Sequence, residues 1–287
     1  MDVSAKSQLR ELNFRPRKGL GQNFLVSPGV LEHILNAAEV QAEDLVLEIG
    51  PGLGVLTRAL AGRAGRVVAV EIDPTLVANL RGQLRDCANV EIVAGDILEL
   101  DLAELMTGSA EIASAPPTTY KVVANIPYNI TSAVIRHLLE ARVRPALIVL
   151  MVQKEVAQRI TATPDEMSLL AVSVQFYGTP RLVHHVPAGA FYPVPKVASA
   201  ILRIEPLAHP RMDEREIDGF FDVVRAGFGQ KRKQLRNALT QGMHLPADSI
   251  LRGMEKAGID PERRAQTLHV DEWITLYRAL DSVRQSS

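Results

Sequence analysis

The sequence predicts an α/β protein with a mostly parallel sheet, followed by a small all-α region. Up to about residue 205, short apolar runs rich in β-branched residues alternate with longer amphipathic runs. Near-continuous apolar strands that alternate with helices are typical of a parallel sheet covered on both faces. Beyond that point the strand-like runs stop and helical patterns follow.

Five strand-like runs and the helices between them make up the expected sheet. The first helix is expected to begin at Ser27-Pro28, because a serine N-cap followed by proline favours a helix start. Asp73 and Pro74 predict the same start for the helix after the second strand. The polar segment 107–119, rich in small residues and proline, is expected to be a surface loop. The strands are expected at 44–50, 66–72, 89–95, 121–125 and 146–152.

Three parts are predicted along the chain. Residues 1–26 form an irregular basic arm, residues 27–205 form the α/β domain, and residues 212–287 form the helical domain. Basic residues cluster in the arm and again in one late segment; either cluster alone is weak evidence for nucleic acid, because charge runs are usually solvated faces. The clusters are Lys6, Arg10, Arg15, Arg17 and Lys18, and Arg225, Lys231, Arg232, Lys233 and Arg236.

Composition excludes several classes of protein. The chain has 287 residues, 47% of them apolar, and a net charge of −1, which fits a soluble globular protein. The apolar stretch 146–152 is too short to cross a bilayer, and the N-terminus has no apolar signal-peptide core. The single cysteine, Cys87, excludes an internal disulfide framework, so we expect a cytoplasmic protein. Zinc-site spacing is absent, and no metal is expected.

A glycine-rich loop follows the first predicted strand. Glu48, Gly50, Gly52 and Gly54 are spaced as E-x-G-x-G-x-G. Glycines at such a position let the backbone turn sharply and approach a ligand. In an open α/β sheet, ligands bind beyond the carboxyl ends of the strands. The loop therefore marks a candidate ligand site.

Two acidic residues narrow the choice of ligand. Glu71 ends the second strand, where a carboxylate can accept both hydroxyls of a ribose, and Asp96 ends the third. A dinucleotide site would need a third glycine where Val55 stands, and the lysine of a P-loop is absent. A plain glycine turn remains the alternative, but the two acids in register favour S-adenosylmethionine as the cofactor.

The stretch VVANIPYNI, residues 122–130, suggests a second part of the site on the same rim. Proline biases Ile126 toward extended angles, so its carbonyl can point outward. That carbonyl and the side-chain oxygen of Asn125 make two acceptors, which match the two N–H donors of an exocyclic amine. Tyr128 supplies a face on which a base can stack. These groups predict a pocket for an amino-bearing base held out of its stack.

Such a pocket explains methyl transfer to an amine. Accepting both N–H bonds frees the nitrogen lone pair and stabilises the charge that develops on the nitrogen. In-line positioning supplies the rest, and no strong general base is required. A strand-end turn is the alternative interpretation of this stretch.

Taken together, these motifs resemble the ribosomal RNA adenine N6,N6-dimethyltransferase family, in particular its bacterial small-subunit (16S) members. The resemblance implies a Rossmann-like S-adenosylmethionine-dependent methyltransferase domain followed by a small RNA-contacting helical domain. The motifs that carry it are KGLGQNFL (18–25), EIGPGLGVLT (48–57), VEID (70–73), GDIL (95–98), NIPYNI (125–130), FYPVPKVASAILR (191–203) and FGQKRKQLRNAL (228–239).

The resemblance also implies roles for single residues. Glu71 would hold the cofactor ribose and Asp96 its adenine amino group. Asn125 would contact both the cofactor and the target amine, while Tyr128 and Phe191 would flank the target base. The residues implied in cofactor binding are Asn23, Leu25, Gly50, Gly52, Glu71, Asp96 and Asn125, and those implied in RNA binding are Lys231, Arg232, Lys233 and Arg236.

The family's substrate is a pair of adjacent adenosines in a hairpin loop near the 3′ end of 16S rRNA, within the small ribosomal subunit. Each adenosine receives two methyl groups, and we expect this activity together with a role in subunit maturation and a monomeric enzyme. Two rivals stay open: a large-subunit rRNA adenine N6-methylase of the macrolide-resistance type, and a mainly non-catalytic assembly factor. A small-molecule methyltransferase is less consistent with the two basic clusters.

Overall fold

The computed structural model describes residues 5–12, 14, 16–17, 19, 21–107, 119–230 and 232–285. The chain divides into two compact units. The sheet unit comprises 1–157 and 178–206, and the helical unit comprises 158–177 and 207–287. Residues 158–177, which the sequence assigned to the α/β domain, thus group with the C-terminal helices.

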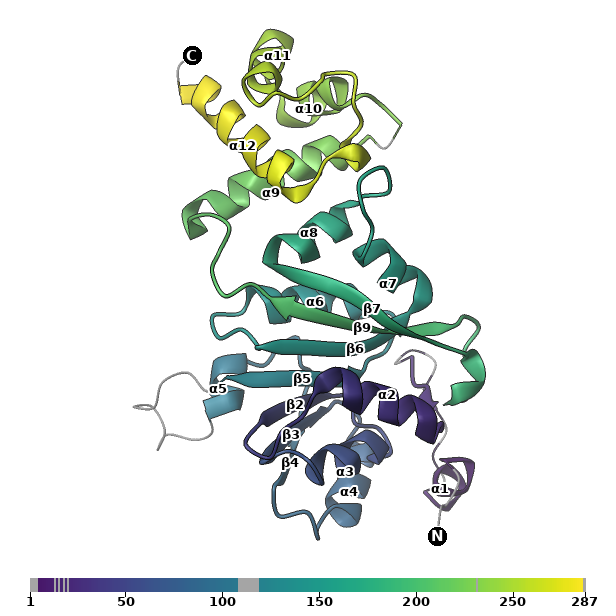
Figure 1. The fold of residues 1–287 in the computed structure, drawn as a ribbon. Helices are drawn as coiled ribbons and strands as arrows, with labels where there is room; N and C mark the ends of the chain where they lie inside the picture. The colour runs from purple at the N-terminus through teal and green to yellow at the C-terminus, as the bar shows by residue number, and fades with distance from the viewer. Residues whose placement is uncertain are drawn as a thin grey trace. The chain divides into compact units, whose positions relative to one another are not determined.

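The sheet unit contains a seven-stranded sheet in the order β4-β3-β2-β5-β6-β9-β7 (Figure 1). Its first five strands run parallel to their neighbours, whereas β9 is antiparallel to both β6 and β7. The five predicted strands are confirmed, and β7 and β9 were not predicted. The strands are β2 (Leu45–Ile49), β3 (Arg66–Glu71), β4 (Val90–Ala94), β5 (Tyr120–Asn125), β6 (Leu147–Gln153), β7 (Gly178–Val186) and β9 (Ser199–Pro206).

Helices bury both faces of this sheet. Val46 and Val67 belong to one buried cluster with residues of α2 and α3, and Figure 1 shows both helices in front of the strands. Val68 and Val122, on neighbouring strands, are likewise fully buried. These helices are α2 (Pro28–Ala38), α3 (Val55–Ala61), α4 (Pro74–Gln83), α5 (Leu102–Thr107) and α6 (Thr131–Glu140).

The predicted helix starts are confirmed. Ser27 accepts a hydrogen bond from the N–H of Val30 at 3.4 Å and caps α2. Asp73 accepts from the N–H of Thr75 at 2.9 Å and caps α4. The predicted loop 107–119 lies almost entirely outside the described residues, since 108–118 are not described.

The N-terminal arm is more ordered than predicted. It contains α1 (Ala5–Glu11), and β1 (Phe24–Leu25) pairs antiparallel with β8 (Phe191–Tyr192), so the prediction of an irregular arm is wrong for these residues. Burial explains the order, because Leu9 packs in one apolar cluster with Leu53. A 3-10 turn, η2 (Ala188–Ala190), leads into β8.

The helical unit packs its helices around an aromatic cluster. The Phe176 ring centroid lies 4.7 Å from that of Phe220 and 5.3 Å from that of Phe221. Asp213 begins α9 with a capping box shared with Glu216. The elements of this unit include α8 (Leu169–Tyr177), α9 (Glu214–Phe228), α10 (Leu235–Met243), α11 (Ala247–Lys256), η3 (Ala265–Thr267) and α12 (Val270–Gln285); α7 (Lys154–Ile160) joins the two units.

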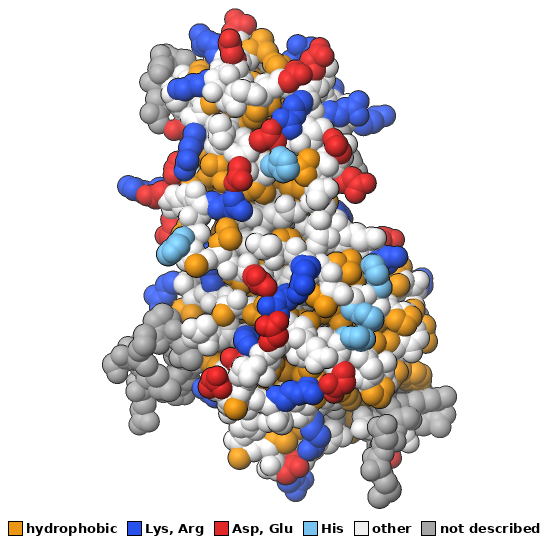
Figure 2. Space-filling view, in the orientation of Figure 1, with side chains coloured by type: hydrophobic (Ala, Val, Ile, Leu, Met, Phe, Trp, Pro, Cys, Tyr) orange, Lys and Arg blue, Asp and Glu red, His pale blue; other side chains and the backbone are white. Residues whose placement is uncertain are grey.

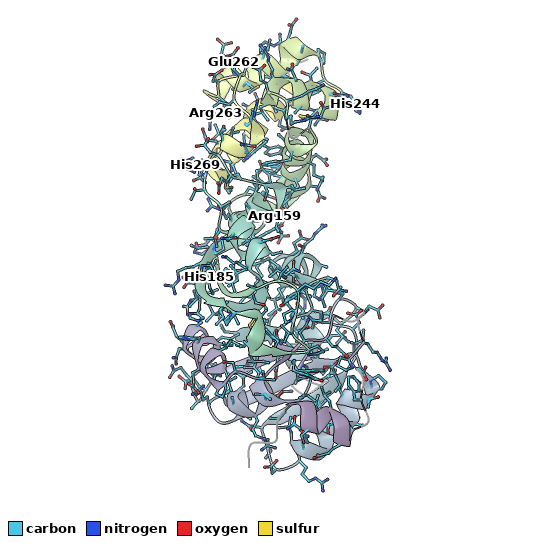
Figure 3. All side chains as sticks on the ribbon, turned by 90° about the vertical axis from the view of Figure 1, so that its right-hand side faces the viewer. Arg159, His185, His244, Glu262, Arg263 and His269 are labelled. Carbon is cyan, nitrogen blue, oxygen red and sulfur yellow. The ribbon has the colours of Figure 1, made fainter. Side chains whose placement is uncertain are left out.

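The late basic segment is only partly helical. Helix α10 begins at Leu235, whose N–H donates to the carbonyl of Arg263 at 2.7 Å (Arg263 is labelled in Figure 3). Leu235 and Leu239, four residues apart and so on one face of the helix, are both buried. Arg232 and Lys233 instead lie in the turn before α10, in which the N–H of Lys233 donates to the Gln230 carbonyl. The pattern KRKQLRNALTQGM (231–243) predicts a helix from the sequence, and this prediction is wrong for Arg232 and Lys233.

Candidate active site

A cavity of about 220 Å³ opens at the carboxyl ends of the strands in the sheet unit. Glu71 ends β3 and Asn125 ends β5, so topology brings them to the same edge of the sheet. All but one of the predicted cofactor and catalytic residues line this cavity. Those that line it are Asn23, Leu25, Gly50, Gly52, Glu71, Asp96, Asn125 and Tyr128.

The glycine loop follows β2 and has three residues in the left-handed region. Gly50, Gly52 and Gly54 have φ of 67°, 59° and 79°. A Cβ at Gly52 would lie 3.0 Å from the ring of Phe24, and a Cβ at Gly54 would lie 2.9 Å from Leu80. Both the turn and the close packing therefore require glycine.

Glu71 holds the glycine loop through its carboxylate. Oε2 accepts from the N–H of Gly52 at 3.1 Å, and Oε1 accepts from the N–H of Asp73 at 3.0 Å. Burial raises the pKa of Glu71, and the hydrogen bonds from Asp73 and Gly52 oppose that rise. Each carboxylate oxygen keeps a further lone pair for a ligand. Glu71 is thus both a structural tie and a candidate ligand-binding group.

Glu48, the first residue of the glycine motif, is a site residue for which the sequence predicted no role. It lines the cavity, is 1% exposed, and its Oε2 has no hydrogen-bond partner among the described residues. Burial raises its pKa to about 8; the neighbouring Thr57 hydroxyl lowers it and Glu71 adds to the rise. At neutral pH the protonated acid is favoured. The feature of the sequence that could have indicated a role for Glu48 is an acidic residue inside an otherwise apolar strand.

Asp96 follows β4 and keeps one carboxylate oxygen unused by the local turn. Its Oδ1 accepts from the N–H of Leu98 at 3.0 Å. The side chain is half-buried and lines the cavity. This arrangement leaves Oδ2 able to accept from a donor in the cavity.

Asn125 is oriented by the N-terminal arm. Its Nδ2 donates to the backbone carbonyl of Asn23 at 3.0 Å. The side chain of Asn23 in turn donates to the Gly21 carbonyl at 3.0 Å, which fixes the local turn. Because the amide nitrogen of Asn125 is committed, its Oδ1 is left to act as an acceptor in the cavity.

The turn after Asn125 uses the carbonyl of Pro127. That carbonyl accepts from the N–H of Ile130 at 3.2 Å and from Oγ1 of Thr131 at 3.5 Å. The side chain of Ile126 is buried and anchors the turn. An outward-facing Ile126 carbonyl, expected from its place before proline, stays a prediction.

Tyr128 is held by a hydroxyl on β9. Its OH lies 2.7 Å from Oγ of Ser199, a fully buried residue. Burial raises the pKa of Tyr128, and the Ser199 hydrogen bond opposes that rise. The ring is neutral at physiological pH and fixed at one edge, which suits a stacking surface.

Phe191 is the predicted catalytic residue that does not line the cavity. It is 2% exposed and belongs to the buried cluster that contains Leu25, with which it pairs across β1 and β8. Its ring therefore packs in the core of the sheet unit. A contact between Phe191 and a target base stays a prediction.

The predicted RNA-binding residues lie in the helical unit. Arg232 and Lys233 are exposed, Arg236 is half-buried at the start of α10, and Lys231 lies outside the described residues. Figure 2 shows basic and acidic side chains interspersed over the visible face. Within the described residues, no group of three or more His, Cys, Asp or Glu could hold a metal.

The cavity suits the predicted cofactor. It offers backbone groups of the glycine loop, where a Cβ at Gly52 or Gly54 would meet neighbouring side chains. It also offers two acids at neighbouring strand ends and Oε2 of buried Glu48, which has no hydrogen-bond partner among the described residues. This set offers acceptors for hydroxyl and amino groups, and the described residues that line the cavity include no lysine or arginine. The residues present therefore fit S-adenosylmethionine better than a nucleotide.

Comparisons with known proteins show the family to which the chain belongs. The profile of the family described as "Ribosomal RNA adenine dimethylase" matches residues 13–282. A ribosomal RNA small subunit methyltransferase A from Dehalococcoides mccartyi is 48% identical over 272 residues, covering 94% of this chain and 90% of that protein. A protein of the same name from Moorella thermoacetica is 44% identical, covering 95% of each chain.

Solved structures share the fold. A dimethyladenosine transferase from Plasmodium falciparum has a TM-score of 0.76 at 26% identity, covering 91% of this chain and 98% of its own. The 23S rRNA methyltransferase ErmE has a TM-score of 0.70 at 30% identity, covering 90% of this chain and 100% of its own. The Rossmann-like methyltransferase fold predicted from the sequence is confirmed. This chain belongs to the ribosomal RNA adenine dimethylase family and is an S-adenosylmethionine-dependent rRNA methyltransferase.

Proposed function

We propose that this enzyme dimethylates N6 of two adjacent adenosines in a hairpin loop near the 3′ end of 16S rRNA, within the small ribosomal subunit. The observation that carries the proposal is the oriented amide of Asn125, held by Asn23 beside Tyr128 in the cavity of the glycine loop. The curated relatives named for the small subunit support this choice of substrate.

The residues of the cavity divide between cofactor and target. Glu71 accepts from the ribose hydroxyls, Asp96 accepts from the adenine amino group, and the glycine loop 50–54 admits the ligand close to its backbone. Asn23 and Leu25 close the cavity from the arm side. When bound, S-adenosylmethionine would supply an electrophilic methyl group from its sulfonium, and the neutral thioether S-adenosylhomocysteine would be the leaving group.

The protein promotes transfer by holding the amine of the target. In the first methylation, Oδ1 of Asn125 and the carbonyl of Ile126 each accept one N–H of the exocyclic amine, which localises the nitrogen lone pair. In the second, one of these acceptors holds the single N–H of the monomethylated amine. The same two acceptors stabilise the positive charge that develops on nitrogen as the N–C bond forms. Tyr128 stacks on the base and sets its plane. One N–H proton is lost to water afterwards, and no strong general base is needed.

The helical unit contributes phosphate contacts. Arg232 and Lys233 are exposed on a turn that is anchored by the hydrogen bond between Leu235 and Arg263, so their side chains start from a fixed backbone. Arg236 follows one turn later, and we retain Lys231 from the sequence as a fourth contact. Such contacts position RNA without reading its sequence.

The proposed setting is a monomeric enzyme in the cytoplasm that acts during subunit maturation. In the part of the chain that the structure describes, no helix is long and apolar enough to cross a membrane. The likeness to ErmE keeps the large-subunit methylase as the second candidate substrate specificity. A mainly non-catalytic assembly factor is the third candidate, against which the complete set of cavity residues argues.

Radiolabelled S-adenosylmethionine tests these alternatives. The enzyme is given unmethylated small subunits in one reaction and naked large-subunit rRNA in another, and the label is mapped to nucleotides. The proposal expects two adjacent dimethylated adenosines in small-subunit rRNA and no label in large-subunit rRNA. Label confined to large-subunit rRNA would establish the second candidate, and an absence of label with tight subunit binding would establish the third.

A further inference from the structure

Arg17 of the N-terminal arm forms an ion pair with Asp73, whose N–H donates to the cavity residue Glu71. Its Nε lies 3.5 Å from Oδ2 of Asp73, whose side chain is fully buried while that of Arg17 is 58% exposed. Oδ1 of Asp73 caps α4 through the N–H of Thr75, but Oδ2 accepts no hydrogen bond from the described residues. Arg17 therefore places a cation beside a buried carboxylate oxygen that accepts no hydrogen bond from the described residues.

Asp73 belongs to a group of buried acids. Glu48, Glu71 and Asp73 are 1%, 5% and 1% exposed, and the N–H of Asp73 donates to Glu71. Among the described residues, Asp73 forms an ion pair with Arg17, whereas Glu48 and Glu71 form none. A buried carboxylate without a counter-charge is costly, and a second one nearby increases the cost. The cation of the arm offsets this cost at the end of the cavity where Glu71 lies.

A chain of short contacts links Arg17 to the cavity wall. The N–H of Arg17 donates to Oε1 of Gln22 at 2.8 Å, and Gln22 lines the cavity beside Asn23. Asn23 accepts from Asn125, as described above. The next residue, Phe24, packs where a Cβ on Gly52 would lie 3.0 Å from its ring. Fixing Arg17 therefore fixes the segment 21–25 that closes the cavity.

We infer that Arg17 is a positioning residue for cofactor binding: its ion pair with Asp73 holds residues 21–25 against the cavity, and loss of the pair opens this wall. The inference rests on the cofactor site of the proposed function, and it is independent of which rRNA is the substrate. The opposing interpretation is that Arg17, as part of a basic arm, contacts an RNA phosphate and has no effect on the cofactor.

Calorimetry with S-adenosylhomocysteine, in the absence of RNA, tests the inference through a double-mutant cycle. The proteins are wild type, Arg17→Ala, Asp73→Asn and the double variant; Asn keeps the α4 cap and removes the charge. We expect Arg17→Ala to raise Kd about 3- to 10-fold, between the effects of exposed and buried pairs. In the Asp73→Asn background, Arg17→Ala should have little further effect, and Arg17→Lys should restore most of the affinity.

Salt and a matched variant separate this role from general loss of charge. Raising ionic strength from about 0.05 M to about 0.5 M should weaken cofactor binding in wild type more than in Arg17→Ala. Arg66→Ala removes a half-exposed arginine paired with Glu91 at the start of β3, and it should leave Kd unchanged. Unchanged Kd in Arg17→Ala, additive effects in the cycle, or failure of Lys to rescue would each overturn the inference. A defect confined to small-subunit binding would instead identify a phosphate contact.

Discussion

The side-chain amide of Asn125 donates to the backbone carbonyl of Asn23 at 3.0 Å and so connects the end of β5 to the N-terminal arm. The acceptor is a main-chain atom, so it persists whatever side chain occupies position 23. The bond commits the nitrogen of the amide, and Asn125 lines the cavity, so its Oδ1 is left to act as the acceptor. An acceptor held in this way needs little reorganisation when charge develops on a target amine.

Removing the carboxylate of Glu71 should weaken cofactor binding. We expect Glu71→Ala to reduce the free energy of S-adenosylmethionine binding by ~1.5–3 kcal/mol, the range for hydrogen bonds to a charged group. The loop at Gly52 also loses its tie to this carboxylate, so thermal unfolding is measured in parallel. Glu91→Ala, an exposed glutamate of the same sheet, is the control and should bind normally. Unchanged calorimetric affinity in a folded Glu71→Ala protein would exclude Glu71 from the site.

Glu48 should make the sheet unit less stable as pH rises. Its pKa in the folded protein is about 8, against an ordinary value of 4.5, so the folded state retains a proton that the unfolded state loses. Its contribution is fully present below pH 4.5 and is lost as pH rises through about 8. A single group of this kind changes the free energy of unfolding by at most about 1.4 kcal/mol per pH unit.

Urea denaturation between about pH 5 and pH 9 measures this dependence. Glu48→Gln cannot ionise, so its free energy of unfolding should fall less steeply with pH than that of the wild type. Glu71, whose pKa is also raised, contributes in the same direction and remains in both proteins. Parallel curves for the two proteins would contradict the burial argument for Glu48.

Loss of the Tyr128 ring should weaken target binding more than loss of the Tyr128 hydroxyl. Tyr128→Phe keeps the ring and loses the bond to Ser199, so we expect nearly normal target binding. Tyr128→Ala loses the stacking face, which is worth ~1–3 kcal/mol per base. Single-turnover titrations with small subunits give the apparent affinity of each variant. Equal defects in both variants would assign Tyr128 a structural role through Ser199 instead.

Arg232 and Lys233 should account for part of the salt dependence of RNA binding. Replacing both with alanine should weaken binding and lower the slope of log affinity against log salt by ~0.7 for each lost contact on single strands. S-adenosylhomocysteine affinity should stay the same. The control replaces Arg252 and Lys256, two exposed cations of α11, and should retain the wild-type slope. Coincident slopes for all three proteins would identify the turn as a solubilising surface.

Much of the sheet unit could be predicted because its strands are buried on both faces. Residues 67–70 and 148–152 read as continuous apolar runs, and caps such as Asp73 marked the helix starts. Strand β7 escaped prediction because, between its buried ends, it alternates exposed and half-buried residues at the edge of the sheet, and it shifts register between Leu182 and His184. Its His184 also stacks on His33 of α2, a contact between distant segments that no spacing indicates.

Site residues at or just after strand ends could be predicted from the sequence. Residues whose position depends on tertiary packing could not. Glu71, Asp96 and Asn125 follow strands whose carboxyl ends meet at one edge, so order along the chain was sufficient. The pairing of Arg17 with Asp73 depends on the path of the arm, which the sequence left undefined. Family resemblance predicted Phe191 as a base-flanking ring; its pairing with Leu25 and its place in the core follow from tertiary packing, and its contact with a base stays a prediction.

Single-turnover methyl transfer to unmethylated small subunits by Asn125→Ala tests the central claim most directly. The variant removes the acceptor while the carbonyl of Asn23 and the ring of Tyr128 remain, and RNA affinity is measured alongside as a control. Loss of one preorganised group of this kind costs ~100–1000-fold in rate, and we predict a loss of that size with RNA binding intact. Asn23→Ala, which keeps the backbone carbonyl, should lose far less. Transfer by Asn125→Ala at nearly the wild-type rate would contradict the proposed role of the Asn125 amide.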